Sequence, residues 1–223
     1  MKLRSKKRPR RKFHAWHPLE KFPPDSLRWP VFAVLLATSL WLGTNAGGGG
    51  LLYNTYTARY GIVSLEVAGT KERAEEIIAF WDSWGARREA IKSIYYDYAF
   101  LLFYSTTLAL ACILAAGRLA HRWPTLGRAG VIVAWTQWLA ALCDAIENYA
   151  LLKILWTNSA YWEGWPKVAT TFASIKFSII GLGLIYVLLP LPLWIIERLA
   201  WLREIIGRAD SSMLEHKTGR RRR

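Results

Sequence analysis

Four long runs of apolar residues dominate the hydropathy pattern of the chain, at about residues 30–52, 94–117, 129–156 and 167–195. Each run is long enough for the ~20 residues that a helix needs to cross the hydrocarbon core of a bilayer. The pattern therefore predicts an all-α fold. We expect an integral membrane four-helix bundle over residues 30–196, with a basic segment at 1–29 and a tail at 197–223.

The longest polar connection, residues 53–92, follows the first apolar run. Within its segment 62–67, Val63, Leu65 and Val67 alternate with Ser64 and Glu66, which is typical of a short strand. A lone strand leaves its backbone groups unpaired. We therefore expect this segment to pair with another strand or to form an extended connector.

An amphipathic helix is expected later in the same connection, beginning after Thr70, whose side chain can cap a helix. Its apolar residues recur at spacings of three and four: Ala74, Ile77, Ile78, Trp81 and Trp84. Such a helix lies on the outer membrane–water interface or caps the helix bundle.

Positive charge is distributed unevenly along the chain, which has a net charge of +14. Residues 1–28 hold ten Lys or Arg against two acids, and residues 197–223 hold eight against four. Residues 51–92 hold six of each. Because Lys and Arg favour the cytoplasmic side, both termini are expected in the cytoplasm and residues 53–92 outside it.

The basic termini also bear on partners. Near an anionic surface each Lys or Arg contributes about 1 kcal/mol, so anionic lipids of the bilayer could bind there. The alternative is that these residues act only as a topology signal. Nucleic-acid binding is not expected, because no folded basic face or stacking platform accompanies them.

Polar residues inside the apolar runs are the candidates for chemistry. In the third run, Asp144, Glu147 and Asn148 share one helical face, and Gln137 lies two turns earlier on the same side. Asp97 in the second run and Lys176 in the fourth fall in the same layer, in the outer half of the bilayer. The candidate ligand- or ion-binding residues are Asp97, Gln137, Asp144, Glu147, Asn148 and Lys176.

Such groups are costly in hydrocarbon. A single Asp or Lys near the centre of a span costs about 2.5–3.5 kcal/mol, so we expect these side chains to face each other or water. Three acids against one lysine leave an excess of two negative charges. Protonation, water or a bound cation could neutralise that excess.

Three functions remain open from the sequence. The first is a binding or transfer site for a small amphipathic or lipid-like ligand, or for a cation. The second is a non-catalytic accessory or scaffold subunit of a larger membrane complex, in which the polar layer only joins helices. The third is a lipid-modifying enzyme that uses acid–base catalysis, so enzymatic activity is left undecided.

No metal or cofactor is expected. The four His residues lie outside the apolar runs, and the chain lacks nucleotide-binding and catalytic motifs such as GxGxxG and HExxH. Cys112 and Cys143 lie at different depths of their helices, too far apart for a disulfide.

The segments "LEVAGTKERAEEIIAFW", "SIYYDYAFLLFY" and "QWLAALCDAIENYALL" resemble a group of bacterial four-span membrane proteins with a DxxEN motif in the third span. The resemblance covers roughly residues 62–190. It implies a bacterial inner-membrane location and no known activity. The four-span plan with intramembrane acids is also similar in architecture to that of sterol-isomerase-like EXPERA proteins, without a shared motif.

Overall fold

The computed structural model of the chain describes residues 16–47, 52, 56–157, 160–192, 195–196 and 198–199. The chain divides into two compact units, residues 1–186 and 187–223. The first unit contains the four long helices, except for the last two residues of the fourth. Most of the two basic terminal segments, residues 1–15 and 200–223, lies outside the described residues.

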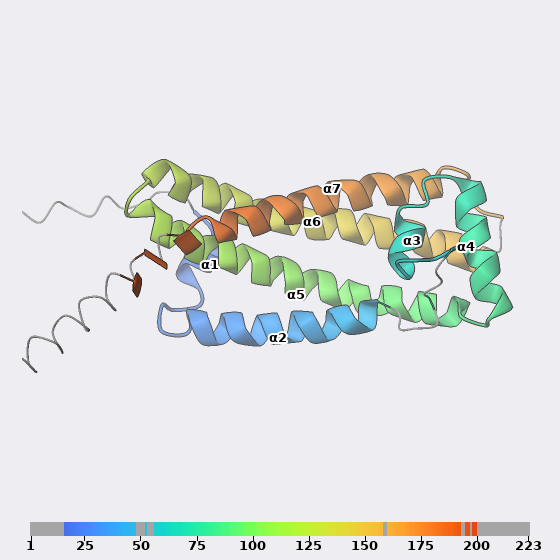
Figure 1. Cartoon of the computed structure of the whole chain (residues 1–223), viewed down its shortest axis with the longest axis horizontal. Helices are drawn as coiled ribbons and strands as arrows, with labels where there is room; N and C mark the ends of the chain where they lie inside the picture. Colours follow the sequence, from blue (N-terminus) through green and yellow to red (C-terminus); the bar gives the residue numbers. More distant parts are fainter. Residues whose placement is uncertain are drawn as a thin grey trace, which may run out of the picture. The chain divides into compact units, whose positions relative to one another are not determined.

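Four long helices run in alternating directions (Figure 1). They are α2 (Arg28–Ala46), α5 (Arg87–Ala120), α6 (Pro124–Trp156) and α7 (Trp165–Leu188). Each is long and apolar enough to cross a membrane, and the described residues contain no strand. The prediction of an all-helical fold with four helices of spanning length is confirmed.

The helix ends differ from the ends of the apolar runs. α5 has 34 residues and α6 has 33, so each is about 50 Å long and exceeds the ~30 Å hydrocarbon core. The first turns of α5 are polar yet helical because Ala90 and Ile94 pack into a buried core. α7 ends at Leu188, short of the predicted residue 195, just before Pro190, whose ring disfavours continuation of a helix.

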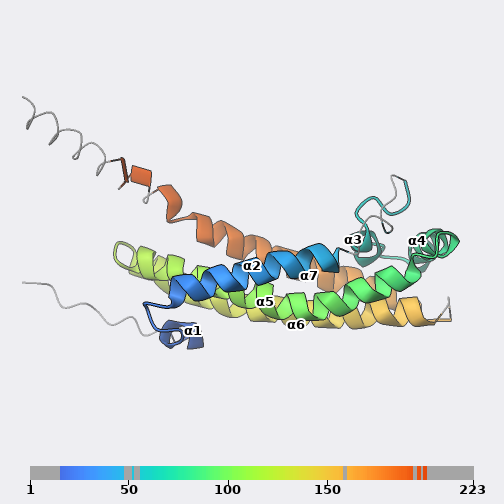
Figure 2. The same ribbon diagram turned by 90° about the horizontal axis from the view of Figure 1, so that it is seen from below.

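Close backbone approaches join the helices. α5 contacts both α2 and α6, and α2 lies beside α5 in both views (Figures 1 and 2). A Cβ atom on Gly43 of α2 would lie 3.2 Å from the Phe100 ring of α5. A Cβ atom on Gly127 would lie 2.6 Å from the Cβ atom of Ala120, so this glycine permits the tight α5–α6 hairpin.

The segment expected to be a strand is instead a short helix, α3 (Ile62–Glu66). Gly61 precedes it at φ 60°, a left-handed conformation that glycine adopts at low cost. Ile62 and Leu65, three residues apart, are both buried, whereas Val67 is exposed. The strand prediction is wrong because a helical turn pairs its own backbone groups and needs no partner strand.

The predicted amphipathic helix is α4 (Lys71–Ser83). Thr70 caps it, since the Thr70 Oγ1 atom accepts a hydrogen bond from Arg73 N at 3.3 Å. Ala74, Ile77, Ile78 and Trp81 are buried as predicted, but Trp84 lies beyond the helix end and is 69% exposed.

Residues 56–86, which include α3 and α4, are called the cap. The buried residues of α4 belong to the same core as Ile94 of α5 and Leu151 and Leu155 of α6. The Trp81 Nε1–H group donates to Leu52 O at 3.1 Å. Of the two expected placements of α4, these contacts match the one that covers the end of the helix bundle (Figure 2).

A short helix that the apolar pattern did not predict, α1 (Pro18–Lys21), precedes α2. The His17 ring at its N-cap is fully buried. Its centroid lies 4.8 Å from the ring centroids of Trp135 and Trp138 on α6. The Trp135 Nε1–H group also donates to Trp16 O at 3.1 Å, so α1 is held against the long helices.

Candidate functional site

Lys176 of α7 lies buried among three carboxyl groups. Its Nζ atom donates to Asp144 Oδ1 at 2.7 Å and lies 2.8 Å from Glu147 Oε2. The contact with Glu147 has the length of an ion pair without the angles of a hydrogen bond. A third carboxyl oxygen, Glu66 Oε2, lies 3.6 Å away. One ammonium group therefore faces three acids.

Helix α6 supplies the centre of the site through its helical periodicity. Asp144, Glu147 and Asn148 are spaced by three and four residues and are all buried. The Asn148 Nδ2–H group donates to Asp97 Oδ2 at 2.6 Å, which links α6 to α5. The structure thus brings together five of the six residues expected from the sequence.

These five residues and Glu66 are called the acid–lysine cluster: Glu66, Asp97, Asp144, Glu147, Asn148 and Lys176.

Glu66 is the member that the sequence analysis missed. The strand pattern placed it on the polar side with Ser64, whereas α3 turns its carboxyl group toward Lys176 and leaves the residue only 8% exposed. A signal was present in the sequence: no other charged residue lies between Arg59 and Lys71.

Thr170 of α7 holds α3 in place above Lys176. Its hydroxyl group donates to Glu66 O at 2.8 Å and accepts from Gly69 N at 2.9 Å. Gly69 has φ 72°, so the chain turns sharply after α3. The cap is therefore tied to the same helix that carries the lysine.

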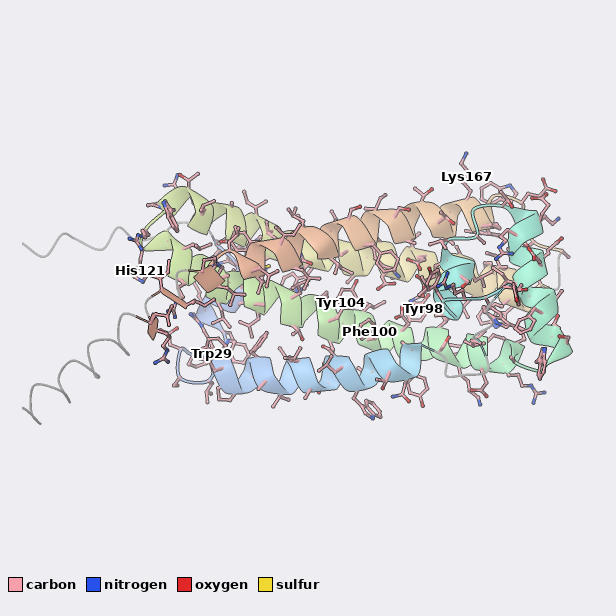
Figure 3. All side chains as sticks on the ribbon, viewed as in Figure 1. Trp29, Tyr98, Phe100, Tyr104, His121 and Lys167 are labelled. Carbon is pink, nitrogen blue, oxygen red and sulfur yellow. The ribbon has the colours of Figure 1, made fainter. Side chains whose placement is uncertain are left out.

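Tyrosines of α5 extend the polar layer. Tyr98 and Tyr104 lie along the middle of this helix (Figure 3). The Tyr98 hydroxyl group donates to Ala145 O at 3.4 Å. The buried Tyr104 hydroxyl group lies within the electrostatic reach of Asp144, yet it has no hydrogen-bond partner among the described residues.

A small cavity of about 10 Å³ lies beside the acids. Glu66, Asp97, Asn148 and Ser93 supply its polar lining, and Ala46, Ile62 and Ile94 supply its apolar lining. A cavity needs roughly 10–15 Å³ of this kind of volume to hold one water molecule. The cavity is therefore at the lower limit for a single water molecule.

Gln137 lies apart from the cluster. It is seven residues from Asp144, about 10 Å along the helix axis. Its Nε2 atom donates to Val133 O at 3.0 Å and to Ile179 O at 3.4 Å. A Cβ atom on Gly183 would lie 2.6 Å from this nitrogen, so Gln137 fills a close α6–α7 contact and its described hydrogen bonds do not reach a carboxyl group.

The cluster has a large excess of acids. Four carboxyl groups accompany one ammonium group, which would give a formal charge of −3 if every group were ionised. Within the described residues, Glu147 Oε1 and Glu66 Oε2 accept no hydrogen bond. Unpaired ionised carboxylates are very costly in a low-dielectric interior, so the arrangement is suited to holding protons.

The described residues contain no group of three or more His, Cys, Asp or Glu that could hold a metal ion. The Lys176 ammonium group occupies the position between the carboxyl groups where a cation would otherwise lie. Cys112 and Cys143 are both buried and free.

No known protein family, no curated protein and no solved structure matches the chain. The geometry of the cluster therefore carries the functional argument.

Proposed function

We propose that the chain is a four-span membrane protein that binds and exchanges protons at the acid–lysine cluster, in the outer half of the bilayer. The observation that carries this proposal is the contact of one buried ammonium group with three carboxyl groups, with a fourth close by. Ionisable groups placed in this way within membrane helices are typical of proton relays and ion pathways.

The depth of the cluster follows from α2. This helix has 19 residues, about 28 Å, which nearly equals the thickness of the hydrocarbon core. Its last residue, Ala46, lines the same cavity as Asp97 and Asn148. Asp144 lies four residues from Asn148, about 6 Å deeper. If α2 spans the core, the cluster lies close to one edge of it, on the side of the cap.

The cavity favours a proton over the larger ligands that the sequence allowed. Glu66 and Asp97 face a space for about one water molecule. A lipid-like ligand, or the substrate of a lipid-modifying enzyme, would not fit in this space. A bare metal cation would have to displace Lys176 from its position between Asp144 and Glu147.

A purely structural role as a joint between helices is less well supported. Such a joint requires each buried polar group to find a partner, because an unsatisfied one costs about 1–3 kcal/mol. Glu147 Oε1 and Glu66 Oε2 lack a hydrogen-bond partner within the described part of the chain.

The proposal predicts how stability depends on pH. If the folded cluster holds protons that the unfolded chain releases at neutral pH, stability decreases as pH rises from about 5 to 8. The titratable and charged groups in the cluster and beside it are Glu66 from α3, Asp97, Tyr98 and Tyr104 from α5, Asp144 and Glu147 from α6, and Lys176 from α7.

Unfolding of the purified protein would be measured over this pH range for the parent, Asp144→Asn and Glu147→Gln. We expect a shallower slope in at least one variant, because the substitution replaces a proton-binding group by a neutral one. Identical slopes in all three proteins would overturn the proposal. A slope that sodium or potassium removes would instead indicate a metal cation as the ligand.

A further inference from the structure

The small cavity connects two acids that no direct bond joins. Asp97 from α5 and Glu66 from α3 both line it, together with Asn148 and Ser93. A buried water molecule usually makes two to four hydrogen bonds to polar groups that would otherwise be unsatisfied. These four side chains provide that number of partners.

The burial and hydrogen bonding of Glu66 indicate that this space holds a water molecule. Its side chain is nine-tenths buried, yet Oε2 has no hydrogen-bond partner among the described residues. The nearest charged atom, Lys176 Nζ, lies 3.6 Å away, too far for a hydrogen bond. A water molecule in the cavity would give the carboxyl group of Glu66, which lines this space, a hydrogen-bond partner.

Exposure decreases in order through the cluster. Asp97 is partly exposed, whereas Asp144 is 2% exposed and Glu147 is fully buried. Glu66, in contact with both the cavity and Lys176, lies between these extremes. Protons from the aqueous side would therefore reach Asp97 first and Glu147 last.

We propose that the cavity binds one water molecule, which passes protons between Asp97 and Glu66 and so connects the aqueous phase with the buried carboxyl groups around Lys176. This inference rests on the proposed proton-binding function. In the inward step, the Asp97 carboxyl group gives a proton to the water molecule, which gives one of its own protons to the Glu66 carboxylate. Asp97 becomes a carboxylate, Glu66 becomes a carboxyl group, and the net charge is unchanged.

The proposal makes Glu66 part of the site even though it lies outside the spanning helices. Because Thr170 ties the end of α3 to α7, the cap would hold Glu66 at the distance that a water bridge requires. Asp97 would be the entry group and Glu66 the receiving group.

The test fills the cavity without removing an acid. Ala46→Val adds two methyl groups to the cavity lining, and Ala37→Val adds the same groups on the exposed side of the same helix as a control. The full-length protein in lipid nanodiscs would be transferred from H₂O to D₂O. Infrared spectroscopy would then follow the shift of the carbonyl band of protonated carboxyl groups.

We expect Ala46→Val to slow the exchange of this band by about tenfold or more, because the water bridge is lost. The size of the band should stay the same, and Ala37→Val should exchange as the parent does. Asp97→Asn provides a second variant if Ala46→Val does not fold, and it should slow the exchange of the remaining band to a similar extent.

If folded Ala46→Val exchanges at the parental rate, the water bridge is overturned and proton binding is left intact. If Ala46→Val does not fold, the same result in Asp97→Asn has the same meaning. A rate that depends on sodium concentration would also overturn the water bridge, because the occupant would then be a cation. Absence of the band in the parent would be a different result, since it would contradict the proposed function itself.

Discussion

At the scale of single residues, the cluster depends on one ammonium group. Lys176 is 5% exposed and contacts carboxyl groups from α3 and α6. Without it, Asp144 and Glu147 would face each other with no positive charge between them. Removal of one partner from a buried ion pair is typically far more harmful than replacement of the whole pair.

The first prediction concerns this lysine. Lys176→Met keeps an unbranched side chain, one heavy atom shorter, without the charge, and should lower the free energy of unfolding by about 3–5 kcal/mol at neutral pH. The loss should be smaller at low pH, where the acids take up protons. Lys167→Met, at an exposed position on the same helix, should change stability by less than about 0.5 kcal/mol.

Reversible unfolding of the purified protein in detergent or lipid would measure both variants. Equal effects of Lys176→Met and Lys167→Met would show that the ammonium group has no special role in the buried layer.

Some residues of the candidate site could be found from the sequence because helical periodicity is regular. The spacing of Asp144, Glu147 and Asn148 was enough to place them on one face. Gln137 shares that face, but no periodicity reveals that Gly183 brings α7 against it. Glu66 could not be placed, because its direction depends on the turn at Gly61 and on the bonds of Thr170.

At the scale of elements, the cap and α1 both depend on contacts with the long helices. α4 could be predicted because Thr70 and a repeat of apolar residues mark a helix. α3 has five residues, too few to show a period, so alternation of Val63, Leu65 and Val67 suggested a strand. The tertiary contacts of Ile62 and Leu65 with the bundle core decided the outcome.

The α1 segment carries a histidine suited to respond to pH. The His17 Nδ1 atom accepts from Leu19 N at 3.1 Å, and the His17 N–H group donates to Glu20 Oε2 at 3.2 Å. Within the described residues Nε2 has no hydrogen-bond partner. Burial lowers the pKa of His17 below its ordinary value, because the charged ring would lose its hydration.

The second prediction follows from the sign of this shift. The folded segment favours the neutral ring, and the undocked segment binds a proton below a pH of about 6.5. The contribution of His17 to docking is therefore complete above about 6.5 and is lost as pH falls below it. Charged groups near the ring are Glu20 and Lys21 on α1 and Arg28 on α2.

Hydrogen exchange of the backbone amides of residues 19–22 would measure this effect after correction for the intrinsic rate. Protection should decrease as pH falls in the parent. It should be nearly independent of pH in His17→Asn, which keeps a capping side chain. His121→Asn, at an exposed site, should behave as the parent does. If protection of these amides in the parent does not depend on pH, His17 does not have this role.

At the scale of the whole molecule, hydropathy was sufficient to predict four helices of spanning length. Their length was harder to predict, because the polar turns at the start of α5 extend beyond the apolar run. Ala90 and Ile94 pack there with the cap, and a sequence pattern does not contain this tertiary contact. The orientation of the termini remains a prediction from the distribution of Lys and Arg.

The cap and the ends of two long helices, α5 and α6, form a second buried layer of the molecule. The ends of α5 and α6 that exceed the hydrocarbon core form, with α4, a core that includes Trp81 and Leu155. The acid–lysine cluster lies next to this core, since Ile94 lines the cavity and also packs in the core. The buried acids therefore lie beside the core that joins the cap to the ends of α5 and α6.

The central claim is that protons neutralise the excess of acids in the cluster. We would record the infrared spectrum of the whole protein at neutral pH, in a detergent that has no ester carbonyl group, for the parent, Asp144→Asn and Glu147→Gln. If protons neutralise the cluster, the parent has a carbonyl band of protonated carboxyl groups that is reduced in at least one variant. A parent spectrum with no such band would show that all the acids are ionised and that protons do not neutralise the cluster.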